Sequence, residues 1–391
     1  MALLKNVNRI SITTDLWKSG QDIQYMVVTG HFINSDWKLQ KRILNFVDVP
    51  PPHSGVAIAD VLCKCFLEWG IENKVATVTV DNVSYNDAAV RNLKDNFTLK
   101  NKLMFGGKIF YVRCTTHIIN LIVQDGLKEI QDIIDNVLQT TLEFKDVFSR
   151  YKERDPGYHY LPTSEDWEKA ENVCQFLEVF NEVTNIISGS EYPTSNLFLT
   201  EIWRVKEVLN EKKVNEKPYI REMTKQMAEK FDKYWGECQD ARQCGSSTSG
   251  DTSTLVRSVV SGRSRFESFV KRTENIQPLK SDLDVYLEEG VYICGRDAEE
   301  SFDALDWWKS NGLKFRILSK MATDILSIPV TTVASESAFN AGGRVIDPYR
   351  ASLATETVQV LMCGEDWACN LRGIKKTHKS ESNGIKEILI P

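Results

Sequence analysis

The 391-residue sequence lacks several features that would restrict its class. No apolar run approaches the roughly 18 residues of a membrane-spanning helix, so we expect no membrane span. Nine cysteines are present, but none forms a C-x-x-C pair, which argues against a zinc ribbon and against a disulfide framework. A reducing compartment fits this cysteine usage. Basic residues do not exceed acidic ones, and the net charge is −6, so any nucleic-acid surface must be a local patch.

The first third of the chain has the composition of a mixed α/β protein. β-Branched and aromatic residues between Gly, Asn, Asp and Ser turns predict strands, and their short connections make the first three antiparallel. Ser54 and Gly70 are the expected start and stop of a helix. The expected strands are 9–17, 25–33, 38–49, 75–80 and 108–113, and the expected helices are 54–69, 84–96 and 115–126. This order of elements is that of a ribonuclease-H-like fold.

The rest of the chain has a helical pattern. Apolar residues recur every three or four positions from Trp167 to Ile187, which predicts a helix-packing core. Thr163 and Asp166 resemble a capping box at the start of that helix. Residues 239–264 are rich in Ser, Thr and Gly and predict a flexible linker. Helical structure is expected to resume near Leu283.

Two aspartates stand where neighbouring strands of the predicted sheet end. Asp15 lies in Thr13-Thr14-Asp15-Leu16-Trp17, and Asp81 directly follows the fourth strand. If these strands are parallel neighbours, both carboxylates reach one sheet edge, with backbones roughly 5 Å apart. Two acids there favour a cation, and a pair of Mg²⁺ ions about 4 Å apart would suit phosphodiester chemistry. Alternatively, each aspartate is a turn or helix-cap residue. The metal hypothesis also needs a third carboxylate on a later helix.

Long segments of the sequence resemble a known family. RISITTDLWKSGQDIQYMVVTGHFINSDWKLQKRIL, TVTVDNVSYNDAAVRNLKDNF and YVRCTTHIINLIVQDGL are similar to hAT-superfamily transposases, and in particular to RICESLEEPER-like transposase-derived proteins that carry a BED zinc finger. DILSIPVTTVASESAFNAGGRVIDPYRASLATETVQVLMCGEDW resembles the hAT C-terminal dimerisation region. The resemblance covers nearly the whole chain outside the 239–264 linker.

The resemblance implies a third carboxylate. The family's catalytic Glu corresponds to Glu336 in Ala334-Ser335-Glu336, so the implied triad and metal-ligand set is Asp15, Asp81 and Glu336. The implied cofactor of an active enzyme is Mg²⁺ or Mn²⁺. In the implied reaction, metal-bound water cuts a phosphodiester at a transposon end, and the freed hydroxyl forms a hairpin on the flanking DNA.

Three further residues are implied to face DNA. Trp17 fits the family's D-x-W pattern, and Cys114 with His117 fits its C-x-x-H motif. Without the resemblance, Trp17 would be a core residue, Cys114 a core thiol and His117 a helix-start histidine. Two ligands do not fill a tetrahedral site, so we expect no structural zinc in this chain.

A basic cluster lies between the second helix and the fifth strand. It consists of Arg91, Lys94, Lys100, Lys102, Lys108 and Arg113. Within that span only Asp95 offsets the positive charge. The cluster is either a phosphate-contacting patch or a solvated face.

The sequence also departs from the family. It has no BED finger, no R-W-N-S-T-like segment after the fifth strand and no LDPR-type segment after Lys233-Tyr234-Trp235-Gly236. We therefore expect a domesticated or truncated transposase derivative that binds DNA, forms a homodimer or higher oligomer and does not transpose efficiently. The alternative is an active DDE transposase that cuts transposon ends through hairpin formation. The resemblance implies a nuclear location, and the lack of a long apolar run leads us to expect no membrane partner.

The expected domain organisation follows from the resemblance. The N-terminal part of a ribonuclease-H-like domain spans 1–128 and a helical insertion spans 129–238. A linker covers 239–282, the C-terminal dimerisation region that completes the catalytic core covers 283–370, and a tail covers 371–391. Leu353, Val358, Leu361 and Met362 are expected to face one side of a last helix. The apolar residues of this C-terminal region, which also include Trp307 and Trp308, form either one core or a subunit interface, and we expect some to close the catalytic core and others to pair subunits.

Overall fold

A computed structural model describes most of the chain, and it divides into two compact units. The described residues are 2–19, 22–99, 103–130, 163–236, 280–290, 302–345 and 353–372. The first unit comprises Met1–His117, Asn185–Phe198 and Leu326–Pro391, and the second comprises Ile118–Thr184 and Leu199–Ile325. The predicted 239–264 linker lies outside the described residues, as do Lys100 and Lys102 of the basic cluster.

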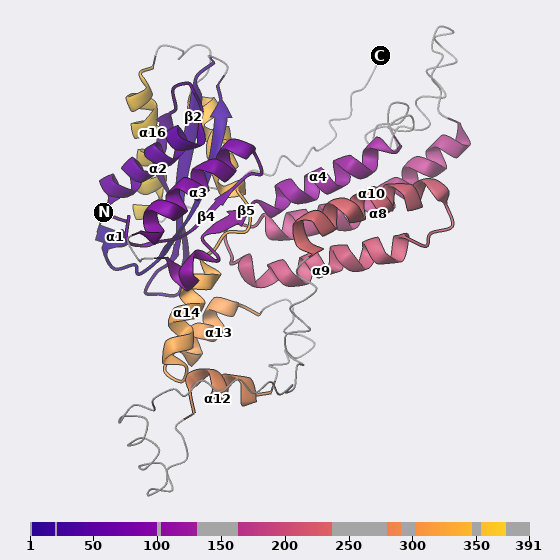
Figure 1. The fold of residues 1–391 in the computed structure, drawn as a ribbon. Coiled ribbons are helices and arrows are strands. Elements are labelled where there is room, and N and C mark those ends of the chain that lie inside the picture. Colours follow the sequence, from indigo (N-terminus) through magenta and orange to yellow (C-terminus); the bar gives the residue numbers. More distant parts are fainter. Residues whose placement is uncertain are drawn as a thin grey trace, which may run out of the picture. The chain divides into compact units, whose positions relative to one another are not determined.

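The first unit is built on a five-stranded sheet (Figure 1). Its strands are β1 (Ile10–Lys18), β2 (Gln24–Ile33), β3 (Leu39–Asp48), β4 (Val75–Val80) and β5 (Tyr111–Arg113). The spatial order is β3-β2-β1-β4-β5, in which β1–β2 and β2–β3 pair antiparallel and β1–β4 and β4–β5 pair parallel. The expected mixed sheet with three leading antiparallel strands is therefore confirmed, together with the parallel pairing of the first and fourth strands.

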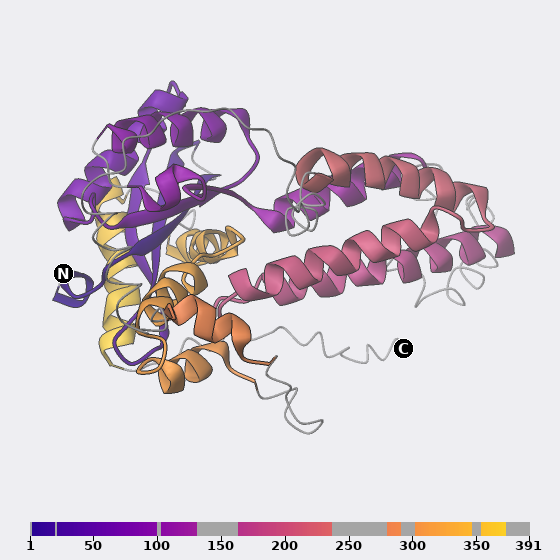
Figure 2. The same ribbon diagram turned by 60° about the horizontal axis from the view of Figure 1, so that its bottom comes forward.

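Helices cover both faces of this sheet. One face packs on α2 (Gly55–Trp69) and α3 (Ser84–Thr98) through an apolar core that includes Ile10, Ile12, Phe66 and Val78. The other face meets α15 (Val333–Val345) and α16 (Thr355–Leu371) through Tyr25, Phe46 and Phe339, among others. The sheet lies between the two helix pairs in Figure 2. The short α1 (Ala2–Lys5) precedes β1.

The ends of α2 follow the predicted capping signals. Ser54 Oγ accepts a hydrogen bond from the Ala57 N–H at 3.2 Å, and Gly70 ends the helix at φ 62° with its N–H donated to Leu67 O at 3.0 Å. Gly55 allows α2 to approach α3, because a Cβ there would lie 2.5 Å from the Ala88 Cβ. The local sequence thus fixes both the length of α2 and its closeness to α3.

The predicted strand over 108–113 is too long. A 3₁₀ turn, η1 (Met104–Gly107), precedes β5, and Gly106 and Gly107 adopt φ values of 62° and 78°. The turn continues into the predicted strand, because Lys108 still has helical backbone angles (φ −62°, ψ −35°) and the Phe110 N–H is donated to Gly107 O at 3.3 Å. Phe110 is fully buried in the apolar core, and its carbonyl accepts the Val78 N–H at 2.7 Å, so only the last three residues continue as β5.

The outer strand β3 is covered by side chains from helices. Its register shifts opposite Val28 and Thr29, which leaves Leu44 as an extra residue. The Ile43 N–H is donated to Asp366 Oδ2 at 3.1 Å, and the Trp367 Nε1–H is donated to Ile43 O at 3.0 Å. The Trp69 Nε1–H reaches Leu44 O at 2.9 Å. Side chains of α2 and α16 thus satisfy backbone groups at the bulge.

One expectation for α16 is wrong. Val358 and Met362 are buried against the sheet as predicted, but Leu361 is 43% exposed. Leu361 immediately precedes Met362, and a step of one residue rotates the side-chain direction on a helix by about 100°. It therefore does not share the buried stripe.

The second unit is helical. It draws on α4 (Thr115–Lys128), α8 (Ser164–Ile187), α9 (Ser195–Lys212), α10 (Pro218–Trp235), α12 (Asp282–Glu288), α13 (Ala304–Asn311) and α14 (Arg316–Leu326). The predicted stripe on α8 is buried, including Trp167, Phe176 and Val183. No helix in the described parts of the chain is long and apolar enough to cross a membrane.

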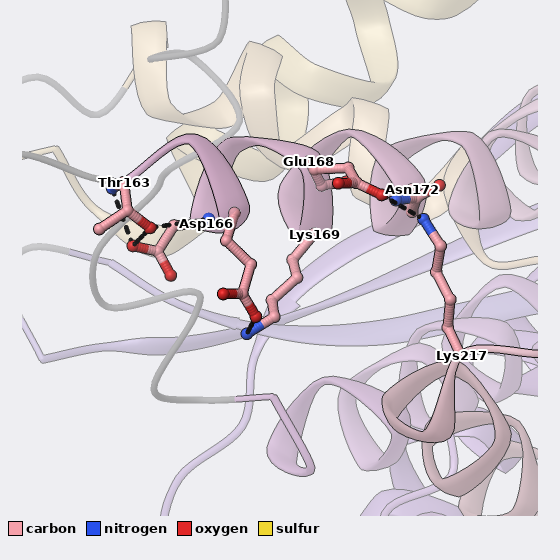
Figure 3. Close-up of polar contacts among 7 residues, drawn as sticks. Thr163, Asp166, Glu168, Lys169, Asn172 and Lys217 are labelled. Atoms are coloured by element: carbon pink, nitrogen blue, oxygen red, sulfur yellow. Dashed lines mark hydrogen bonds and ion pairs between the residues drawn. The ribbon is translucent and has the colours of Figure 1, made fainter.

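The start of α8 carries the predicted capping box (Figure 3). The Asp166 N–H is donated to Thr163 Oγ1 at 3.2 Å, and the Thr163 N–H is donated to Asp166 Oδ2 at 2.9 Å. The Thr163 hydroxyl also donates to Asp166 Oδ2 at 2.7 Å, and this hydrogen bond, together with that from the Thr163 N–H, lowers the pKa of the Asp166 carboxyl. Lys217 also forms an ion pair with Glu168 at 2.8 Å, which links the start of α10 to α8.

Candidate active site

Asp15 and Asp81 lie at the same edge of the sheet. Thr13 of β1 stands opposite Thr79 of β4 in the parallel pair. Asp15 and Asp81 each come two residues later, so both lie at the carboxyl end of this strand pair, on the same face of the sheet as Thr13 and Thr79. Strand β1 continues through Asp15 to Lys18, which places Asp15 within the strand rather than at its last residue.

The Asp15 carboxyl has an unusual environment. Burial, then the negative charge of Asp81 and, least, that of Glu336 together raise its pKa to about 7, although a hydrogen bond from the Leu16 N–H at 2.8 Å acts in the opposite direction. Glu336, more than 300 positions later in the chain, thus acts on the Asp15 carboxyl together with Asp81. The three acids share one electrostatic environment, in which a cation would relieve their mutual repulsion.

Asp81 is held by the start of α3. Its Oδ1 accepts a hydrogen bond from the Asn86 side-chain amide and lies 3.4 Å from the Val83 N–H. Asn86 is itself buried, in the first turn of α3. Asp81 therefore has a helix-start contact as well as a place at the sheet edge, so both sequence interpretations describe part of its surroundings.

Glu336 enters this edge from the first turn of α15. The segment before it, Ser327–Thr332, is hydrogen-bonded across the sheet. Thr79 Oγ1 donates to Pro329 O at 2.8 Å, and the Thr115 N–H is donated to Val330 O at 2.9 Å. The Glu336 side chain is exposed, and its Oε1 accepts from Thr332 Oγ1 at 2.9 Å.

The carboxylates have the right donor chemistry for a hard divalent cation, because Mg²⁺ and Mn²⁺ prefer oxygen ligands. The geometry is looser than a formed site. Among the described residues, no group of three or more His, Cys, Asp or Glu side chains is close enough to hold a metal ion. The three carboxylates therefore lie at one edge of the sheet and interact electrostatically, but they do not converge on a common metal position.

The three residues implied to face DNA have different surroundings. The Cys114 side chain is completely buried, so it is not available to nucleic acid in this arrangement. Trp17 is half-buried and stacks on Tyr25 and Phe339, with ring centroids 6.2 Å and 5.8 Å apart, as the packing alternative describes. His117 is half-buried in the first turn of α4.

Four residues of the basic cluster lie within the described parts of the chain, namely Arg91, Lys94, Lys108 and Arg113. Arg91 and Lys94 lie on α3, and Arg91 is exposed. Arg113 is 3.5 Å from Asp87 and its guanidinium lies 5.3 Å from the centre of the Tyr111 ring. Asp87 precedes the basic span in the sequence, so counting charges within the span overlooked this acidic neighbour of Arg113.

Sequence reasoning missed three residues beside the acids. Burial and the charges of Asp81 and Asp15 raise the pKa of the Tyr85 phenol, which places it near both carboxylates. The buried side-chain nitrogen and oxygen of Asn82 have no hydrogen-bond partner. Thr332 contacts Glu336. The only sequence signal for these residues is their spacing. Asn82 and Tyr85 come one and four residues after Asp81, and Thr332 comes four residues before Glu336, a spacing at which side chains adjoin on a helix.

Three family models match the chain. The ZBED1 RNase-like domain matches residues 13–109, a hAT-like transposase domain with an RNase-H fold matches residues 196–242, and the hAT family C-terminal dimerisation region matches residues 282–368. The first match includes Asp15 and Asp81, and the last includes Glu336.

Curated relatives match over nearly the whole chain. Zinc finger BED domain-containing protein RICESLEEPER 2 of Oryza sativa subsp. japonica is 29% identical over 98% of this chain and 68% of its own length. The putative AC transposase of Zea mays is 29% identical over 94% and 58%, and DAYSLEEPER of Arabidopsis thaliana is 28% identical over 92% and 64%. The chain spans about two thirds or less of the length of these relatives.

The alignments also contain large gaps. The match to RICESLEEPER 2 extends over 496 positions, more than the 391 residues of this chain. That relative therefore has more than a hundred residues inside the aligned region without a counterpart here. This agrees with the expected loss of internal segments.

Proposed function

Because this chain belongs to the hAT transposase family, we propose that it is a transposase-derived protein that dimerises, binds DNA and does not transpose efficiently. One observation carries the proposal. The three acids share the carboxyl edge of the ribonuclease-H-like sheet, yet the described residues offer no three-ligand group for a metal ion. Such an arrangement suits a retained nucleic-acid scaffold with weakened chemistry.

The surface of α3 supports DNA binding. Arg91 is exposed and Lys94 half-buried, and both lie on the helix that begins beside Asp81. We expect the double variant Arg91→Ala/Lys94→Ala to weaken binding to duplex DNA. The slope of log Kd against log salt concentration should fall by the amount expected for the loss of about two phosphate contacts. Fluorescence anisotropy across a salt series measures both quantities. Lys64→Ala, an exposed lysine on α2, is the matched control. An unchanged salt dependence in the double variant would contradict this surface.

Exposed apolar side chains support dimerisation. Leu287 on α12 is 69% exposed, and Ile317 on α14 is 73% exposed. Both lie within the matched dimerisation region. Tyr286, Trp307, Trp308 and Phe315 hold α12, α13 and the start of α14 together through ring contacts. Burial of such surface in a subunit contact would remove it from water.

Light scattering tests the dimer. We expect Leu287→Asp/Ile317→Asp to convert a dimer into a monomer without unfolding it, since both positions are exposed. Leu199→Asp on α9, which is 68% exposed and lies outside the matched dimerisation region, should leave the dimer intact. A wild-type protein that is monomeric at micromolar concentration would overturn this part of the proposal.

A second candidate function is metal-dependent DNA cleavage. It is favoured by the electrostatic environment of Asp15, whose pKa is raised to about 7 by burial and by the charges of Asp81 and Glu336. In that function Asp15 and Asp81 would hold the cations together and Glu336 would complete the second site. Bound Mg²⁺ or Mn²⁺ would stabilise the charge that develops on a phosphodiester during its cleavage. The unpartnered polar atoms of Asn82 beside Asp81 fit a site that a ligand or its water completes.

Cleavage is tested with transposon-end DNA and Mn²⁺. The main proposal predicts little nicking, whereas the second function predicts nicking that Asp81→Asn abolishes. Nicking that persists in Asp81→Asn would exclude this site as its source. A DNA-binding role further implies a nuclear location, which a fluorescent fusion in cells tests.

A further inference from the structure

The sheet face toward α15 contains a buried polar layer. Ser11 and Thr13 of β1, Thr29 and His31 of β2, and Thr77 and Thr79 of β4 all have at most 5% exposure. They meet buried hydroxyls of the segment before α15 and of α15 itself, at Ser327, Thr331, Thr332 and Ser335. A core usually avoids so many polar groups unless they are paired. Hydroxyls of Ser11, Thr13 and Thr79 are paired with Ser327, Ser335 and Pro329 O, whereas Thr29 Oγ1 and Thr77 Oγ1 have no hydrogen-bond partner. The paired groups define how α15 lies on the sheet.

One hydrogen-bond chain ties α15 to the strand that carries Asp15. Ser335 Oγ donates to Thr13 Oγ1 at 2.9 Å, and Thr13 Oγ1 lies 3.0 Å from His31 Nε2. Burial lowers the pKa of His31 to about 3, so the imidazole is neutral at physiological pH and one ring nitrogen can accept the Thr13 proton. Thr13 and Asp15 lie on the same face of β1. Ser335 immediately precedes Glu336.

A second chain reaches the Glu336 carboxylate itself. Thr332 Oγ1 lies 2.9 Å from Glu336 Oε1 and 3.2 Å from Cys114 Sγ, and the Thr332 N–H is donated to Cys114 Sγ at 3.4 Å. A carboxylate only accepts hydrogen bonds, so the single hydroxyl proton of Thr332 serves Glu336. The sulfur then anchors the Thr332 backbone. Cys114 in turn is fixed to β4, because its N–H is donated to Val80 O at 2.8 Å.

We propose that Thr332 and Ser335 are positioning residues for Glu336. Thr332, anchored by Cys114, orients the carboxylate, and Ser335 fixes the helix turn that carries it to the strand of Asp15. The inference rests on the second candidate function, in which Glu336 completes a cation site with Asp15 and Asp81, and it assigns the buried Cys114 to the support of Glu336 rather than to DNA. The two chains start from different strands and meet on consecutive residues of one helical turn, so together they set both the height and the direction of Glu336.

A helix cap alone would not produce this arrangement. Thr332 directly precedes α15, where a cap hydroxyl normally accepts an N–H of the first turn. The Thr332 carbonyl accepts the Ser335 and Glu336 N–H groups at 2.8 Å and 3.0 Å, as the carbonyl at any helix start does. The Thr332 hydroxyl instead lies between the Glu336 carboxylate and the Cys114 sulfur.

Mn²⁺ binding, followed by electron paramagnetic resonance on the full chain, tests the proposal without requiring DNA cleavage. Thr332→Val removes the hydroxyl at constant shape, and Thr332→Ser restores it. We expect Thr332→Val to weaken Mn²⁺ binding by about 10-fold, as loss of a residue that orients a metal ligand does. Thr332→Ser should remain within about twofold of wild type, and Ser335→Ala should weaken binding in the same direction. Ser337→Ala is the matched control, because Ser337 lies on the same helix and donates to Ala334 O.

The outcomes separate this inference from the proposed site. Weaker binding in Thr332→Val and Ser335→Ala, with Thr332→Ser and Ser337→Ala near wild type, supports positioning. If Glu336→Gln weakens Mn²⁺ binding but Thr332→Val and Ser335→Ala lower only the melting temperature, the positioning role is wrong and the cation site stands. If wild type and Glu336→Gln bind Mn²⁺ equally, the cation site fails and the inference fails with it. Should Thr332→Val not fold, Ser335→Ala decides.

Discussion

The two faces of β1 are built on different principles. Ile10 and Ile12 point into an apolar core with α2 and α3, whose residues all come from the first 111 positions apart from a half-buried Trp367 at its margin. Ser11 and Thr13 point the other way, into hydroxyl groups 316 and 322 positions later in the chain. The apolar face needs only the right volume, whereas the polar face needs each donor to meet its acceptor. One face therefore stabilises the sheet, and the other positions what lies on it.

The largest expected effect comes from opening a cavity in the apolar face. Phe66 is fully buried and contacts Phe97, with ring centroids 6.3 Å apart. We expect Phe66→Ala to lower the unfolding free energy by about 3–5 kcal/mol, the usual loss for a large core aromatic. Urea unfolding monitored by hydrogen exchange of the β1 and β4 amides measures it. Leu67→Ala, which changes a 63% exposed neighbour, should stay within about 0.5 kcal/mol. Equal losses would contradict the assigned packing.

A hydroxyl deletion tests the polar face. Thr13→Val keeps the side-chain shape but leaves the Ser335 hydroxyl and His31 without their partner. We expect a loss of about 1–3 kcal/mol, because buried polar groups become unsatisfied. Ile12→Val, one residue away on the apolar face, should lose about 0.5–1.5 kcal/mol. The same urea measurement compares them, and a Thr13→Val variant as stable as wild type would refute the pairing.

The buried histidine makes the polar face sensitive to acid. Folded His31 has a pKa of about 3, against 6.5 for an unperturbed histidine, so as the pH falls through this window the unfolded chain takes up a proton that the folded chain does not. His31 should therefore cost about 2 kcal/mol of stability at pH 5 relative to pH 7. Unfolding free energies at both pH values should differ less in His31→Gln than in wild type. Identical pH dependence would show that His31 is not held neutral.

The smallest effect is expected at a helix end on the apolar side. Ser54→Ala removes the hydroxyl that accepts the Ala57 N–H, which should cost about 1 kcal/mol. Ser35→Ala, in an exposed turn, is the control and should stay within about 0.5 kcal/mol. A comparable loss at both serines would remove the special role of the cap.

Local patterns predicted the apolar side of the molecule well. The strand alternation, the Ser54 and Gly70 signals and the Thr163 capping box depend on neighbours within a few residues, and the structure confirms each of them. The fifth strand was overextended, because residues 108–110 continue the turn that η1 begins, and the propensities of their side chains do not register this.

The candidate site was only partly predictable. The strand order placed Asp15 and Asp81 together, but Glu336 came from the family resemblance, since no local pattern links it to them. The contact between Cys114 and Thr332 joins positions 218 residues apart and left no signal in either segment. Asp87 was overlooked as a partner of Arg113 because it lies on α3 before Arg91, the first residue of the basic cluster.

The covering of β3 by α16 has a consequence for shortened versions of this protein. A polypeptide that ends before Thr355 would lose Asp366 and Trp367 and uncover the Ile43 amide and carbonyl at the bulge. Bare backbone on an outermost strand recruits other extended chains. Aggregation of such a fragment would then result from the exposed edge strand rather than from native dimerisation. The helix α16, which lies in the matched dimerisation region, therefore also protects the sheet from aggregation.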